Sequence, residues 1–233
     1  MHKALPNILY FKGDVFMKTK KLVTSAMLLA FALILSFIQI LNLPFGGSIT
    51  LLSMLPVVFI SYIYGCKWGV FCAFIYALLQ MLVGMGTISA FFLPGESQMA
   101  FFSAIMICLI DYILAYSVLG FAGLFKDKFK SRFSEIALGA LLATFLRYIM
   151  HIISGYIFFG AWASWFFGAS DGLGQISALK GFSLYVLNNF SGNVLSFIYS
   201  LIYNGAYMIP EIILTTLFAP LIYKVIKKSN PDL

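Results

Sequence analysis

The chain has 233 residues, of which 62% are hydrophobic and only 10% are charged, and its formal net charge is +7. Soluble domains carry about 25% charged residues, so this chain lacks the polar surface that water requires and is expected in lipid. Its basic residues stand in short segments between apolar runs, so the positive charge does not indicate nucleic-acid binding.

The apolar runs predict helices rather than strands. Each run approaches the ~20 residues that a helix needs to cross the hydrocarbon core of a bilayer. The alternation of apolar and polar residues that is typical of membrane barrels is not found in them. The three cysteines (Cys66, Cys72 and Cys108) lie in or beside apolar runs without metal-binding spacing, so neither a disulfide framework nor a metal site is predicted. The predicted fold class is an all-α, polytopic membrane protein.

The first 21 residues are predicted to form a cytoplasmic amino-terminal segment. Met17 is followed by three lysines (Lys18, Lys20 and Lys21) and leads directly into the first apolar run. Residues 12–14 also match the translation of a purine-rich ribosome-binding site. We therefore predict that translation starts at Met17, and recovery of peptides from residues 1–16 in native cells would contradict this.

Six membrane spans are predicted within a single transmembrane domain, residues 22–225, which a cytoplasmic tail follows at 226–233. The spans cover residues 22–42, 50–64, 68–87, 101–124, 136–159 and 197–224. Proline and glycine at positions 44–47 end the first span, because proline lacks a backbone donor and glycine permits tight turns. The second span is short and contains Pro56.

Residues 161–196 allow two interpretations. Trp162 and Trp165 are typical of a membrane interface, so we favour a long extracellular segment that contains an interfacial helix. A seventh span is the alternative, which Asp171, Lys180 and several glycines disfavour. With six spans, nearly all lysines and arginines outside the spans fall on one side, which places both termini in the cytoplasm.

Four ionisable residues lie inside predicted spans, where such groups are costly and often functional. Asp111 lies in the fourth span, Arg147 and His151 share one face of the fifth, and Glu211 lies in the sixth. Structural alternatives remain open for each. Asp111 and Arg147 can pair as a lock between helices, His151 can make an interhelical hydrogen bond, and for Glu211 we favour an interfacial position.

Considered as a set, these residues indicate a site for a small aromatic cation. A carboxylate can neutralise the charge, tyrosine rings can stack on the ligand and attract it by cation–π contact, and the amide of Asn204 can read polar ring atoms. No hydrolase, nucleotide-binding or metalloprotease motif is found, so the chain is not predicted to be an enzyme and no cofactor is expected. Ala26 and Ala30, four residues apart in the first span, would let another helix approach closely, although such alanine pairs also arise by chance.

Several segments resemble the thiamine transporters of the ThiT type, also called the YuaJ family. The resemblance covers most of residues 20–225 and is strongest at six short segments. These are residues 46–48, 68–70, 110–112, 146–155, 158–160 and 199–204.

The resemblance implies the substrate-binding (S) component of an energy-coupling factor (ECF) importer in a bacterial plasma membrane. In that family six helices bind thiamine near the extracellular face, and a transmembrane coupling protein and two ATPase subunits drive uptake. The implied ligand-binding residues are Asp111, Tyr112, His151, Phe159, Tyr199, Asn204 and Phe101. Ala26 and Ala30 fall on the motif that docks the coupling protein.

The chain departs from the family pattern in ways that leave close relatives of thiamine as alternative ligands. Asp111 stands where some members have glutamate, Phe159 where some have a stacking tryptophan, and Phe101 where a pocket tyrosine is found. Two other functions remain open. One is a stand-alone proton-coupled carrier that uses Asp111 or Glu211, and the other is an intramembrane enzyme that uses His151 and Asp111.

Overall fold

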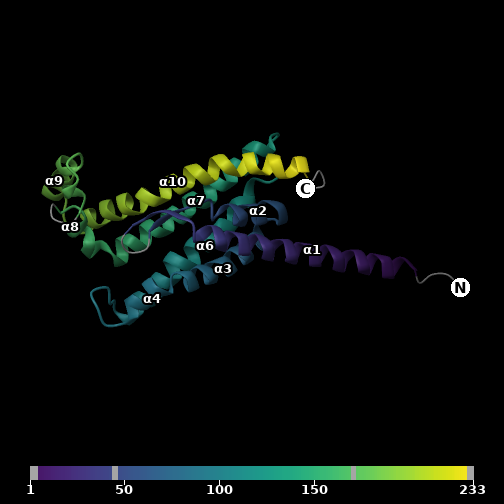
Figure 1. Cartoon of the computed structure of the whole chain (residues 1–233), viewed down its shortest axis with the longest axis horizontal. Helices are drawn as coiled ribbons and strands as arrows, with labels where there is room; N and C mark the ends of the chain where they lie inside the picture. The colour runs from purple at the N-terminus through teal and green to yellow at the C-terminus, as the bar shows by residue number, and fades with distance from the viewer. Residues whose placement is uncertain (1–4, 44–46, 169–171, 230–233) are drawn as a thin grey trace.

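The computed structural model describes residues 5–43, 47–168 and 172–229, with side chains from residue 17 onward. Helices dominate the chain, and a short hairpin of two strands follows the first helix (Figure 1). The first half contains α1 (Leu5–Ser36), β1 (Gln39–Asn42), β2 (Ser48–Thr50), α2 (Leu55–Tyr64), α3 (Cys66–Val83) and α4 (Met85–Phe92). The predicted turn at Pro44 and Gly46 lies outside the described residues.

The second half begins with one rod built from four helical segments: α5 (Phe101–Ile107), the π-helix η2 (Cys108–Leu114), α6 (Ala115–Ser117) and the 3-10 helix η3 (Val118–Phe125). The long helix α7 (Arg132–Phe158) follows, and Ser131 caps its start by accepting a hydrogen bond from the backbone N–H of Ser134. The chain ends with η4 (Gly160–Trp162), α8 (Ala163–Phe166), η5 (Leu173–Gln175), α9 (Lys180–Asn189) and α10 (Gly192–Ser229).

The helices confirm the predicted membrane fold. Five helical stretches in the described chain are long and apolar enough to cross a bilayer, and α2 is a shorter apolar helix of 10 residues. The five stretches are Met17–Ser36, Cys66–Val83, Phe101–Phe125, Arg132–Phe158 and Gly192–Lys228. Pro56 lies in the first turn of α2, where proline costs no helical hydrogen bond.

The hairpin was not predicted, and it shortens both helices beside it. The first span was expected to run to residue 42 and the second to start at 50, whereas α1 ends at Ser36 and α2 starts at Leu55. The intervening residues pair antiparallel, with Leu41 opposite Ile49. Hydropathy alone cannot separate these cases, because β-branched apolar residues suit a strand as well as a span.

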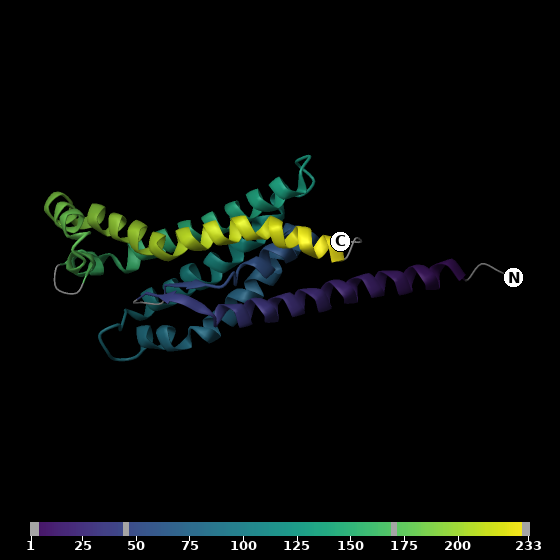
Figure 2. The same ribbon diagram turned by 45° about the horizontal axis from the view of Figure 1, so that its top comes forward.

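Helices α7 and α10 run side by side (Figure 1). The helix η3 packs against α2, α3 and α7. Helix α1 packs against α2 and α3 through one face, and its other face is exposed. The start of α1 and the end of α10 lie at one end of the bundle, and α8 and α9 lie at the other (Figure 2). This placement suits an even number of crossings.

Basic residues gather at the end of the bundle that carries the termini. The Lys21 ammonium lies 4.3 Å from the centroid of the Trp68 ring, just after the turn between α2 and α3. The Lys126 ammonium donates to the carbonyl oxygen of Ile63, just before the same turn, at 2.8 Å. In the segment expected outside, 161–196, α9 has 10 residues, too few to cross a bilayer. The orientation of the two ends in the membrane stays a prediction. Asp171, which was used to disfavour a seventh span, lies outside the described residues.

Close helix approach depends on glycine at Gly120. A Cβ atom there would overlap the backbone of Val70, so η3 and α3 touch backbone to backbone. We expect Gly120→Ala to lower the unfolding temperature of the purified protein by several degrees, because overpacking costs about 1–3 kcal/mol. Gly86→Ala is the matched control, since a Cβ at Gly86 meets nothing within 4 Å. Equal unfolding temperatures for the two variants would contradict this account of the packing.

The fourth span changes its winding at the centre of the bundle. The π-helix η2 contains Asp111, and the tighter η3 follows after one short α-helical segment. A π-helix holds more residues per turn than an α-helix, and such segments often occur at functional sites. Asp111 and Tyr112 of η2 and Tyr116 of the following segment line the same cavity.

Candidate ligand-binding site

A cavity opens between the hairpin, α4, the rod that contains η2, α7 and α10. Its volume is about 100 Å³, and both polar groups and aromatic rings line it. Its lining residues are Gly47, Ser48, Thr87, Phe91, Ile107, Asp111, Tyr112, Tyr116, Arg147, His151, Gly155, Phe159, Tyr199, Tyr203, Asn204 and Tyr207.

The structure brings six of the seven predicted ligand-binding residues to this cavity: Asp111, Tyr112, His151, Phe159, Tyr199 and Asn204. Phe101 is the exception. Its side chain is 72% exposed, and its ring contacts Phe92. Phe101 starts the rod ten residues before Asp111, which is about 15 Å along a helix, so the structure does not place it in the cavity lining.

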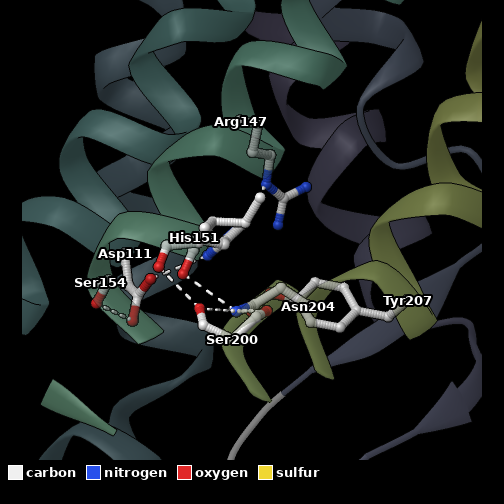
Figure 3. Close-up of polar contacts among 8 residues, drawn as sticks. Asp111, Arg147, His151, Ser154, Ser200, Asn204 and Tyr207 are labelled. Atoms are coloured by element: carbon white, nitrogen blue, oxygen red, sulfur yellow. Dashed lines mark hydrogen bonds and ion pairs between the residues drawn. The ribbon is translucent and has the colours of Figure 1, made fainter. Parts of the chain in front are cut away.

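Asp111 is held by two hydrogen bonds from α7 (Figure 3). Its Oδ1 lies 3.0 Å from Nδ1 of His151, and its Oδ2 accepts from the Ser154 hydroxyl at 2.8 Å. The Asp111 side chain keeps 20% of its surface exposed. Asp111 therefore pairs with His151 and not with Arg147, so the direct lock considered from the sequence is not formed.

Arg147 lies on the far side of the His151 ring. Its Nε donates to Nε2 of His151 at 3.2 Å, and its guanidinium carbon lies 4.1 Å from the centroid of the Tyr116 ring. Both Arg147 and His151 are buried, because they lie on the face of α7 that meets the cavity. Asp111, His151 and Arg147 thus form one continuous polar chain across two helices.

Asn204 joins α7 to α10 behind the histidine (Figure 3). Its Nδ2 lies 3.1 Å from the His151 carbonyl oxygen and 2.9 Å from that of Ser200, and its Oδ1 accepts from the Tyr207 hydroxyl at 2.8 Å. A Cβ at Gly155 would overlap the Ser200 hydroxyl, so the two helices approach closely here. Asn204 consequently fixes the position of the site in addition to bordering it.

Aromatic rings form the remaining wall. Tyr199, Tyr203 and Tyr207 lie four residues apart on one face of α10, with adjacent ring centroids 5.6 and 6.4 Å apart. On the opposite side the Phe159 ring packs edge-on against Phe91 at 5.9 Å. A planar ligand between these walls can make stacking and cation–π contacts.

The sequence led us to expect an interfacial position for Glu211, and this prediction is wrong because Glu211 is buried. Its residue is 2% exposed, and its Oε1 accepts hydrogen bonds from the backbone N–H and the hydroxyl of Thr50 at 2.5 and 2.6 Å. Helix α10 continues to Ser229, so Glu211 lies near its middle and faces the hairpin. Hydropathy could not reveal this, because the partner strand was not predicted.

Other cavity residues were missed for identifiable reasons. Tyr116 and Phe91 look like ordinary packing residues in the sequence, and the π-helix that precedes Tyr116 leaves no compositional signal. Ser154 follows His151 by three residues, so helical periodicity could have placed it on the same face.

Comparisons with known proteins identify the family of the chain. Residues 22–169, more than half of the chain, match the family model described as thiamine transporter protein (Thia_YuaJ). The chain is 27% identical over 214 residues to thiamine transporter ThiT of Bacillus subtilis (strain 168), covering 87% of this chain and 90% of that protein.

A solved structure shares the fold. The structure of ThiT from Listeria monocytogenes covers 93% of this chain and 97% of its own, with a TM-score of 0.59 and 22% identity. The family match includes Asp111, Tyr112, His151 and Phe159. The chain belongs to the Thia_YuaJ family of thiamine transporter proteins.

Proposed function

We propose that this chain captures thiamine at the extracellular side of a bacterial plasma membrane as the S component of an ECF importer. The observation that carries the proposal is one partly exposed carboxylate, Asp111, in a cavity lined by aromatic rings. Thiamine carries a permanent positive charge on its thiazolium ring and has two flat aromatic rings. The family membership and the names of the relatives support the same ligand.

The cavity residues divide the work of recognition. Asp111 balances the thiazolium charge, because a buried cation needs an opposite charge to replace its water. Phe159, Tyr199 and Tyr112 supply ring faces, and the second lone pair of Asn204 Oδ1 can accept from the aminopyrimidine. His151, whose two ring nitrogens are engaged by Asp111 and Arg147, holds the carboxylate in place. No bond of the ligand is broken in this process, so the chain needs neither a catalytic residue nor a cofactor.

Energy for transport is proposed to come from a separate coupling protein and two ATPase subunits. Ala26 and Ala30 are exposed on the face of α1 that does not pack against α2 or α3. Small exposed side chains permit another helix to approach closely within a membrane. We assign this face to the coupling protein.

Two measurements test the proposal. The purified protein, titrated with thiamine in a calorimeter, should bind one equivalent, and mass analysis of the bound ligand should recover thiamine unchanged. Proteoliposomes should take up thiamine only when the coupling protein, the ATPases and ATP are all present. Uptake by this chain alone, abolished when the proton gradient is collapsed, would instead establish the proton-coupled carrier.

A further inference from the structure

A second, smaller cavity lies behind the first. Its volume is about 40 Å³, and its lining includes Glu211, Gln80 and Arg147. Ser48, Tyr116 and Arg147 line both cavities, so these three residues form the partition between them. A polar cavity of this size is large enough to hold water.

Glu211 and Gln80 each direct an unsatisfied polar atom at this region. Oε1 of Glu211 is fully engaged by Thr50, whereas its Oε2 has no hydrogen-bond partner among the described residues. The same holds for Nε2 of Gln80, and both residues are more than nine-tenths buried. Both bonds from Thr50 are donated to Oε1, so a carboxylate accepts them without a proton of its own. Arg147 is the cation in the lining of this cavity.

The hydrogen bonds along α7 fix the charge on His151. Arginine can only donate, so Nε2 of His151 must offer a lone pair to Nε of Arg147. The ring proton is then on Nδ1, which donates to Asp111, and the imidazole is neutral. The acidic and basic residues around the two cavities are therefore two carboxylates, Asp111 and Glu211, and one cation, Arg147.

We propose that Glu211 compensates the charge of Arg147 across the second cavity, which leaves the charge of Asp111 to a monovalent organic cation in the first. The inference rests on the proposed function. Asp111, Glu211 and Arg147 together carry one net negative charge before the ligand binds, and with a bound monovalent cation the total is zero. A cation can therefore replace water without leaving a buried charge uncompensated. Glu211 is a positioning residue, since it acts through Arg147 and lies outside the lining of the first cavity.

The test compares two ligands in four proteins. The two ligands are thiamine and a neutral analogue in which an uncharged ring replaces the thiazolium. Their affinities are measured in wild type, Glu211→Gln, Arg147→Gln and the double variant. Glutamine at 211 can still accept from Thr50, so the hairpin keeps its anchor. Binding of the neutral analogue reports whether each variant is folded.

Glu211→Gln should weaken thiamine binding about tenfold or more, because it leaves the charge of Arg147 uncompensated. Arg147 then repels the bound cation, since unit charges ~10 Å apart still interact at an effective dielectric constant near 20. The neutral analogue should change less than about threefold. Because Arg147 also lines the first cavity, its variants are judged by the ratio of thiamine affinity to neutral-analogue affinity. This ratio should be at least that of wild type in Arg147→Gln and within about threefold of it in the double variant.

Three results would overturn the inference: equal losses for both ligands in Glu211→Gln, an unchanged thiamine affinity there, or a ratio in the double variant as low as in Glu211→Gln. Each of these leaves the proposed function standing if wild type binds thiamine. A wild-type protein that fails to bind thiamine overturns both.

Discussion

Replacing Asp111 with asparagine is expected to weaken thiamine binding by about 100-fold or more. Removing one member of a buried charge pair costs about 3–5 kcal/mol, because the other charge is left uncompensated. Asparagine has nearly the same shape but only one acceptor oxygen, so the variant loses the charge and one of the two hydrogen bonds, from His151 or from Ser154. Isothermal titration of the purified variant measures the loss directly.

Two controls separate charge from packing at this position. Asp111→Glu keeps the charge and should retain far more affinity than Asp111→Asn. Ser154→Ala removes one hydrogen bond to the carboxylate but keeps its charge, so it should cost less affinity than Asp111→Asn. An affinity of Asp111→Asn within about threefold of wild type would count decisively against a cation site.

Replacing Ala26 and Ala30 together with leucine is expected to abolish ATP-driven uptake while leaving thiamine affinity unchanged. Both alanines are exposed, whereas Ser25, Leu29 and Ala32 form the buried face of α1. Leucine on the exposed face therefore meets lipid in the isolated protein and meets the coupling protein only in the complex. Co-purification with a tagged coupling protein measures assembly.

Ala206→Leu is the matched control, because Ala206 is exposed on α10. It should leave both assembly and binding intact. If the double α1 variant still co-purifies with the coupling protein, docking through Ala26 and Ala30 is wrong, and another surface must carry the interaction.

The sequence was sufficient for features that depend on hydropathy and on rare residues. Long apolar runs predicted the membrane helices, because few soluble arrangements tolerate them. Asp111 and His151 stood out, since ionisable groups are rare at membrane depth, and the structure places them 3.0 Å apart. Nothing in the sequence, however, showed that His151 would separate Asp111 from Arg147.

Features that depend on tertiary pairing could not be predicted. The hairpin forms because two short segments, β1 and β2, pair with each other. The pattern of a single sequence does not show which segments pair. The burial of Glu211 follows from the hairpin, because Thr50 of β2 is its partner. Phe101 was assigned by resemblance alone, and its position at the start of the rod keeps it from the cavity.

The extra-wide turn around Asp111 has a consequence for how such proteins diverge. Removing one residue from 108–114 would relax η2 to ordinary α-helical winding, with both ends of the rod still in their places. A neighbouring side chain would then occupy the place of the carboxylate. A single codon lost from this stretch would therefore remove the anionic group from the cavity without moving either end of the span.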